Sequence, residues 1–394
     1  MAPTQTGSTM AQVYATLLLL LLVSSGPVSA QTDPIPMPTA PDVGARAFIL
    51  TDHDSGQLLG ERLADERMEP ASITKLMTAY VVDVALRDGD IQADDMVTIS
   101  EKAWRTEGSR MFIEVGKQVS LEDLMKGLVI QSGNDAAVAL AEHVAGSEQA
   151  FAALMNHHAE QLGLSNTHFM NATGLPHPDH YMSARDIANL SRAVIREFPG
   201  HYALYAEKEY TYNKIRQYNR NQLLWRDESV DGLKTGHTES AGYCLAASAL
   251  RGDQRLISVV LGAPDEKGRT SASQTLLNYG FRFFKTHKLY DAEQPLTQTR
   301  VWKGDRSELG LGLAETLYIT VPRGRYKDLQ ASMVIKPQIE APVAAGAEMG
   351  RVNVVLDDET LADVPLIALS QVAEGGLFGR LTDQAIMTFQ SLFD

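Results

Sequence analysis

The chain has 394 residues, a formal net charge of -14 and 44% hydrophobic residues. This length predicts two domains, and the hydrophobic content allows a sizeable core but is too low for an integral membrane protein. The acidic balance argues against nucleic acid as the main partner, because binding to phosphates needs a basic surface.

An apolar run near the N-terminus predicts a signal peptide over residues 1–30. Six consecutive leucines occupy positions 17–22, and small residues follow at 28–30. The run is shorter than the roughly 20 apolar residues with which a helix crosses a bilayer, and such a core followed by small residues suits a signal peptidase site. We expect cleavage after residue 30, although no basic residue precedes Arg46. The four prolines that follow predict a linker over residues 31–44.

The next segment, residues 45–289, carries the patterns of an α+β domain. Helical periodicity, capping residues and strand alternation are all present. The expected elements are a hairpin at 47–59, helices at 72–88, 121–130, 135–144, 148–162 and 183–197, strands at 243–249 and 256–261, and a helix at 268–285. Helices first, then strands, then a closing helix predict an antiparallel sheet covered by helices. The single cysteine, Cys244, lies in an apolar stretch and is predicted to be a buried thiol.

Beyond residue 289 the helical periodicity stops, and residues 290–376 predict a small all-β domain. The expected strands lie at 299–302, 316–321, 331–335 and 351–356. In residues 377–394 apolar side chains return at three- and four-residue spacing, which predicts an amphipathic helix. Taken by itself, this helix either docks on its own domain or lies in a membrane interface.

Three short motifs follow one another along the α+β domain. Residues 72–75 read SITK at a helix start, residues 132–134 read SGN between two helices, and residues 234–236 read KTG at a strand. Each alone is weak, since a surface lysine, an N-cap or a turn produces the same letters. Together and in this order they are the set found in β-lactamases and penicillin-binding proteins.

The first motif places a nucleophile and a base on one helix face. Ser72 and Lys75 are one turn apart. A serine hydroxyl is a weak nucleophile until a neighbour takes its proton, and a lysine does so only if burial or nearby positive charge lowers its pKa. In the second motif, Ser132 offers a further hydroxyl, and the Asn134 amide is positioned to orient substrate and lysine.

The third motif predicts a strand edge that pairs with an extended substrate backbone. Gly236 allows that backbone to approach closely, and Lys234 and Thr235 are predicted to bind a carboxylate. A backbone N–H just beyond the motif is expected to help form an oxyanion hole.

These motifs, with similar stretches at 213–217, 231–238, 280–284 and 374–380, make the chain resemble the low-molecular-mass penicillin-binding proteins of the D-alanyl-D-alanine carboxypeptidase type. The resemblance spans nearly the whole mature chain. It implies a β-lactamase/transpeptidase-like domain followed by a β-rich domain and a C-terminal amphipathic helix. It also implies that no cofactor and no metal are needed.

The resemblance further implies a role for each site residue. Ser72 attacks the carbonyl between two D-alanines and forms an acyl-enzyme, Lys75 activates it, and Ser132 relays a proton beside Asn134. Lys234, Thr235 and Gly236 lie near the terminal carboxylate of the substrate. Arg269 pairs with that carboxylate, while His237 and Arg216 support the residues that contact the substrate.

The implied substrate is a peptidoglycan stem peptide ending in D-alanyl-D-alanine, with β-lactams as inhibitors that acylate Ser72. The implied location is the periplasm, at the outer face of the inner membrane, with the C-terminal helix as the attachment. Two alternatives stay open. A serine β-lactamase shares the motifs, although no E-x-x-L-N lies between Asp135 and Leu233. The other is a non-catalytic penicillin-binding scaffold.

His177 and His180 lie three residues apart, a spacing that raises the alternative of a metal site. The neighbouring prolines predict a loop, and no H-E-x-x-H motif or cysteine cluster supports a ligand set. The two histidines are therefore expected in a solvated loop.

Overall fold

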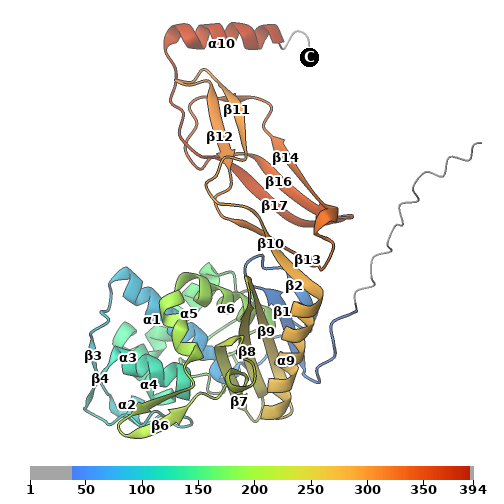
Figure 1. The fold of residues 1–394 in the computed structure, drawn as a ribbon. Helices are drawn as coiled ribbons and strands as arrows, with labels where there is room; N and C mark the ends of the chain where they lie inside the picture. The colour runs from blue at the N-terminus through green and yellow to red at the C-terminus, as the bar shows by residue number, and fades with distance from the viewer. Residues whose placement is uncertain (1–37, 391–394) are drawn as a thin grey trace, which may run out of the picture. The chain divides into compact units, whose positions relative to one another are not determined.

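The computed structural model describes residues 38–390 (Figure 1). The predicted signal peptide, and the part of the predicted linker before residue 38, lie outside the described residues. Within the described part, helices and an antiparallel sheet come first and a second group of strands follows, so the predicted α+β architecture is confirmed.

The site is built on a five-stranded antiparallel sheet with the order β2-β1-β9-β8-β7. Its strands are β1 (Ala47–Asp52), β2 (Leu58–Arg62), β7 (Val230–Thr238), β8 (Gly242–Arg251) and β9 (Gln254–Ala263). The third motif lies on β7, which is an edge strand and leaves one side of its backbone available to a partner.

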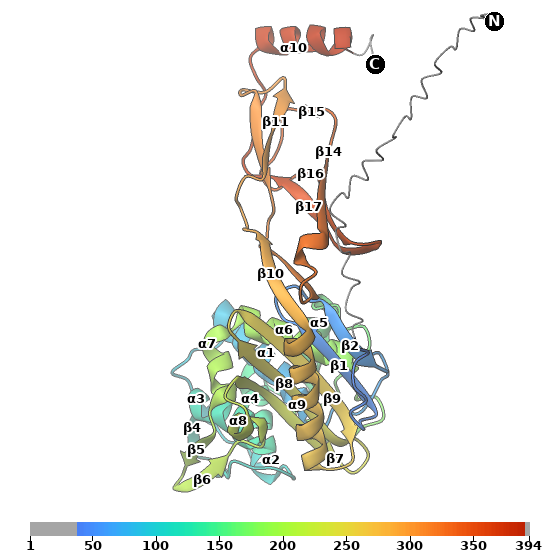
Figure 2. The same cartoon turned by 45° about the vertical axis from the view of Figure 1, so that its right-hand side comes forward.

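Alternation along the central strands gives the sheet two apolar faces. On β9, Ile257, Val259 and Leu261 pack into one core, whereas Leu256 and Val260 pack into the other. Successive side chains of a strand point to opposite faces, so both faces of this sheet must be covered. Helix α9 covers one face and the main group of helices covers the other, as Figures 1 and 2 show.

The helices begin and end close to the predicted positions. Ser147 and Ser183 cap two of them, each accepting a hydrogen bond from the backbone N–H three residues on. The helical elements are η1 (Ala71–Thr74), α1 (Lys75–Asp88), α2 (Glu101–Arg105), α3 (Leu121–Lys126), η2 (Gly127–Gln131), α4 (Asn134–Ala145), α5 (Glu148–Gln161), α6 (Ala184–Glu197), α7 (Pro199–Tyr202), η3 (Ala203–Ala206), α8 (Leu223–Arg226) and α9 (Glu266–Phe283).

Two short two-stranded sheets that the sequence patterns did not predict complete this domain. They are β3 (Met96–Thr98) with β4 (Gln118–Ser120), and β5 (Glu209–Tyr212) with β6 (Ile215–Tyr218). Cys244 on β8 is fully buried, as predicted, and burial raises the pKa of its thiol to about 11.

The domain boundary predicted at residue 289 lies within strand β10. This strand directly follows α9 and pairs with β13. A six-stranded sheet has the order β14-β16-β17-β12-β11-β15. The strands are β10 (Phe284–Tyr290), β11 (Thr297–Trp302), β12 (Glu308–Gly312), β13 (Leu317–Pro322), β14 (Leu329–Ile335), β15 (Ile339–Glu340), β16 (Glu348–Leu356) and β17 (Glu359–Ala368), with η4 (Tyr326–Asp328) before β14.

The predicted amphipathic helix forms as α10 (Leu377–Gln390). Its large apolar side chains are exposed, namely Leu377, Phe378, Leu381, Ile386 and Phe389. Asp383, on the same helix, accepts a hydrogen bond of 2.6 Å from the backbone N–H of Lys303. Among the described residues, no helix is both long and apolar enough to cross a bilayer.

Candidate active site

The first motif forms a tight turn followed by a helix. Ser72 lies in the short helix η1, and Lys75 is the first residue of α1. The side chain of Lys75 is buried, with a residue exposure of only 1%. A lysine is rarely buried this fully unless it is paired or functional, so its contacts decide what it does.

The amine of Lys75 lies between three oxygen atoms. Its Nζ is 2.9 Å from the hydroxyl oxygen of Ser72, 2.6 Å from Oδ1 of Asn134 and 2.8 Å from the backbone carbonyl oxygen of Thr173. A neutral amine has two N–H groups and one lone pair. It can therefore donate to the two carbonyl oxygens and accept the proton of Ser72, which is the arrangement of a nucleophile and its base.

The electrostatic surroundings favour the neutral amine. Burial and the nearby guanidinium of Arg220 lower the pKa of Lys75 to about 7, while the carboxylate of Asp135 acts in the opposite direction. At neutral pH a substantial fraction of Lys75 is therefore unprotonated and able to act as a base.

The second and third motifs meet through Ser132 and Lys234. Ser132 follows η2 with a left-handed backbone (φ 64°), and its hydroxyl accepts a hydrogen bond of 2.8 Å from Nζ of Lys234. Burial first, and then the charges of Lys75, Arg220 and Arg269, lower the pKa of Lys234 well below its usual value. The structure thus brings the three motifs into one buried cluster.

Gly236 shows why the third motif ends in glycine. A Cβ at this position would lie 2.7 Å from the backbone oxygen of Pro70, just before the catalytic turn. The sequence predicted a close approach by substrate backbone, and the structure shows an approach by the chain's own backbone. Gly236 also lines the cleft, and the approach of substrate backbone at this position stays a prediction.

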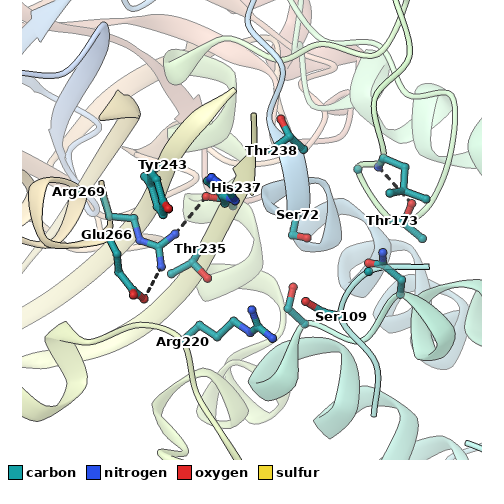
Figure 3. Close-up of a pocket in the computed structure, with 16 residues that line it drawn as sticks. Ser72, Ser109, Thr173, Arg220, Thr235, His237, Thr238, Tyr243, Glu266 and Arg269 are labelled. Carbon is teal, nitrogen blue, oxygen red and sulfur yellow. Dashed lines mark hydrogen bonds and ion pairs between the residues drawn. The ribbon is translucent and has the colours of Figure 1, made fainter. Parts of the chain in front are cut away.

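A cleft of about 330 Å³ opens over these residues (Figure 3). It is lined by Ser72, Gly108, Ser109, Ser132, Asn134, Thr173, Gly174, Leu175, Arg220, Thr235, Gly236, His237, Thr238, Tyr243, Glu266 and Arg269. Serine and threonine hydroxyls and two guanidinium groups give it a polar, cationic surface. Such a surface suits a ligand that carries a carboxylate.

Arg269 occupies the predicted place on α9. Its guanidinium donates 3.1 Å to the backbone oxygen of Gly236 and 3.0 Å to Oε1 of Glu266, and it lies over the ring of Tyr243 at 5.5 Å. The ring of His237 packs against the same tyrosine, tilted by 34°, with its centroid 4.0 Å from that of Tyr243. Both predicted residues therefore line the cleft.

Arg216, predicted to support the site, is not among the residues that line the cleft. It is on the β5–β6 hairpin, exposed, and its Nε donates 3.0 Å to Glu209. Arg220, which the sequence analysis missed, lines the cleft instead. Across residues 38–390 the structure gives it no carboxylate partner. The asparagines on either side are a turn signal that marks this segment, since the side-chain oxygens of Asn219 and Asn221 each accept a hydrogen bond from the backbone N–H two residues on.

The sequence analysis also missed the loop that supplies the Thr173 carbonyl. The side-chain oxygen of Asn171 accepts hydrogen bonds from the backbone N–H groups of Thr173 and Gly174 at 3.1 and 2.8 Å, which fixes the turn. The expectation of a solvated loop at His177 and His180 is half right. His177 is partly exposed, with 41% of its side chain accessible, but His180 is buried, because it points inward beneath the catalytic turn.

Comparison with known proteins agrees with this geometry. The family model described as D-alanyl-D-alanine carboxypeptidase matches residues 35–265, and that of the penicillin-binding protein 5 C-terminal domain matches residues 284–374. The chain belongs to the D-alanyl-D-alanine carboxypeptidase family. It is 48% identical to D-alanyl-D-alanine carboxypeptidase DacC of Escherichia coli over 362 residues, which is 90% of each chain.

Solved structures show the same relation. Penicillin binding protein 5 from Haemophilus influenzae superposes with a TM-score of 0.81 at 43% identity, covering 86% of this chain and all of that one. The ampicillin-bound form of penicillin-binding protein D2 from Listeria monocytogenes matches with a TM-score of 0.57 at 30% identity, covering 62% of this chain and 100% of the other.

The main functional prediction is therefore confirmed. The chain is a serine-type D-Ala-D-Ala carboxypeptidase, a peptidase and hydrolase of cell-wall metabolism, and the β-lactamase and scaffold alternatives are not supported.

Proposed function

We propose that this carboxypeptidase removes the terminal D-alanine of peptidoglycan stem peptides through an acyl-enzyme on Ser72. The carrying observation is the contact of 2.9 Å between the Ser72 hydroxyl and a buried amine whose pKa is lowered to about 7. Neutral Lys75 takes the hydroxyl proton while the serine oxygen attacks the carbonyl carbon between the two D-alanines. The C–N bond then breaks, and the departing D-alanine takes a proton. Water hydrolyses the ester and restores Ser72.

The residues around the nucleophile receive separate roles in this proposal. Ser132, bonded to Lys234, passes the proton to the leaving amine, and Asn134 orients Lys75. Thr235 and Arg269 face the carboxylate of the terminal D-alanine, with Arg220 as a further cation at the cleft. In this proposal the backbone N–H of His237, one residue beyond the third motif, stabilises the oxyanion.

The direct test is incubation with a pentapeptide ending in D-alanyl-D-alanine, followed by mass spectrometry of both peptide and protein. We expect loss of one alanine from the peptide and a transient mass increase on the peptide that contains Ser72. Release of alanine by a Ser72→Ala protein at the wild-type rate would falsify the proposed nucleophile.

We also propose that β-lactams acylate Ser72, because the cleft binds a group that ends in a carboxylate beside a strained or scissile amide. The ampicillin-bound relative supports this assignment. Incubation with benzylpenicillin should add the mass of the whole drug to the Ser72 peptide. A lactam turnover faster than the release of D-alanine would contradict the ranking of the two activities.

We propose that the enzyme works in the periplasm after removal of residues 1–30 and attaches to the outer face of the inner membrane through α10. The exposed apolar side chains of α10 support this, since Phe378 is 89% and Leu377 76% exposed. Replacing both by serine should lower the partition constant for phospholipid vesicles, measured by co-sedimentation, by about 10-fold or more, because two large apolar side chains no longer leave water on binding. Replacing Gln384 and Thr388 by serine is the control, and equal loss there would contradict an apolar attachment.

A further inference from the structure

A buried histidine lies behind the catalytic turn and takes no part in the mechanism above. His180 is only 2% exposed, and its Nε2 lies 2.8 Å from the hydroxyl oxygen of Thr74. The backbone N–H of Met170 donates 3.2 Å to its Nδ1. Because Nδ1 accepts, Nε2 carries the proton and donates to Thr74. Burial, helped by His168 and His177, lowers the pKa of His180 to about 4, so the ring is neutral at physiological pH.

His180 holds residues 169–175 against the turn that carries the nucleophile. Two further contacts join the same segment to helix α1. The hydroxyl of Thr78 donates 2.7 Å to the backbone oxygen of Ala172, and Nζ of Lys75 donates 2.8 Å to that of Thr173. The three contacts are made by Thr74, Lys75 and Thr78, which share the side of the helix that faces this segment.

The packing at Gly174 shows how closely the segment fits. A Cβ there would lie 1.9 Å from the backbone oxygen of Ala71 and 2.8 Å from the hydroxyl oxygen of Thr74. The backbone at Gly174 therefore packs directly against the backbone at Ala71, close to Lys75. A small outward movement of the segment would separate the Thr173 carbonyl from the amine and let water reach it.

We infer that His180 is a positioning residue for the peptidase reaction, which keeps the Thr173 carbonyl on the Lys75 amine by tying Thr74 to Met170. The residue touches no reacting atom and acts only through the segment that it holds. The inference rests on the proposed function, because its effect is read from the acylation of Ser72. It predicts that loss of the ring's two hydrogen bonds exposes Lys75 to water and raises the pKa of its amine.

The other groups that face Lys75 come from three different elements and are untouched by a change at position 180. They are Arg220 in the loop after β6, Lys234 on β7 and Asp135 on α4. On the side of His180, the titratable neighbours are His168 and His177. A change in the pH dependence of acylation therefore reports on the position and hydration of Lys75.

The test compares three variants of the full chain by the rate of Ser72 acylation with benzylpenicillin between pH 5 and 9. For His180→Leu we expect about 10-fold slower acylation at pH 7 and an acid limb displaced upward by about one pH unit. His180→Gln retains a donor and an acceptor and should stay within about threefold of wild type. His177→Leu makes the same change at a partly exposed position of the same loop and should match wild type.

A second route to the same contact protects the test against misfolding. Thr74→Val keeps the volume but removes the hydroxyl that His180 bonds, so it should move the acid limb in the same direction. If His180→Leu does not fold, Thr74→Val decides the matter. If either variant folds and the acid limb of its acylation rate lies at the wild-type pH, the positioning role is overturned. Failure of the wild-type protein to be acylated at Ser72 would instead overturn the proposed function.

Discussion

The peptidase domain and the β-rich domain bury very different side chains. Around the cleft, Lys75, Lys234, Asp135 and Arg269 are all at least 95% buried, whereas from Phe284 onward the buried polar side chains of the described residues reduce to Thr320. Burying a charge is costly unless it is paired or loses its proton. The difference therefore separates a domain organised for chemistry from one organised for packing.

The two domains also use their ion pairs differently. In the β-rich domain, Arg351 and Asp363 pair at 2.8 Å on the surface, with both side chains nearly half exposed, and such a pair contributes little to stability. In the cleft, Lys75 and Lys234 have no carboxylate within bonding distance among the described residues. Burial first, and then the positive charge concentrated there, lower the pKa of both lysines, and the same positive charge is available to bind an anion.

The largest effect should come from the nucleophile itself. Ser72→Ala removes the only group that forms the covalent bond, so we expect peptidase activity to fall by about 10⁴-fold, measured as release of D-alanine. The matched control is Ser165→Ala, the same change at an exposed loop position, which should leave the rate unaltered. A small loss of peptidase activity in Ser72→Ala would contradict the assignment of the chemistry to this site in the peptidase domain.

A core substitution in the β-rich domain should affect stability and not chemistry. Leu366 on β17 is fully buried among apolar side chains, so Leu366→Ala should lower the free energy of unfolding by about 2–5 kcal/mol. Acylation of Ser72 at 25 °C should change by less than about twofold. Thr360→Ala, at an exposed position of the same strand, should stay within about 0.5 kcal/mol in denaturant titration. Equal losses of stability and acylation in Leu366→Ala would show that the two domains are coupled.

The pH dependence of acylation should follow the lysine base. Because the pKa of Lys75 is lowered from 10.5 to about 7, the neutral amine is lost below that value. The rate should fall about 10-fold per pH unit on the acid side. The contribution of Lys75 to stability also rises with pH. Between about pH 7 and 10.5 the unfolded chain binds more protons at this residue than the folded protein does, so raising the pH favours the folded state. A rate that stays level from pH 8 to pH 5 would exclude Lys75 as the base.

The smallest of the expected effects is that of a change at Arg220, which lines the cleft. Arg220→Gln removes a positive charge that lowers the pKa of Lys75, so the acid limb should move to higher pH and acylation at pH 7 should fall by about 3- to 10-fold. Arg216→Gln, four residues earlier, breaks only its surface pair with Glu209 and serves as the control. A larger effect at position 216 than at position 220 would reverse the structural assignment.

The elements that the sequence analysis placed correctly are those with local signals. Helices α5 and α6 begin after serine caps, and α1 ends at Gly89 with a left-handed backbone that glycine accepts readily. Strand β17 was missed because it contains Pro365, which argues against a strand. The left-handed Ser132 after η2 was also missed, since only the contacts around it hold that backbone.

The amino-acid sequence by itself determined which residues are the candidates for the reaction, because the spacing within each motif predicts one helix turn, one loop and one strand. Only the tertiary structure decided which side chains surround them. Arg220 replaces Arg216 at the cleft, and the Thr173 carbonyl and the His180 ring reach the catalytic turn from distant segments. Residues that are close in the sequence specify local geometry. The burial and neighbouring charge that lower the pKa of a lysine arise only when separate segments pack together.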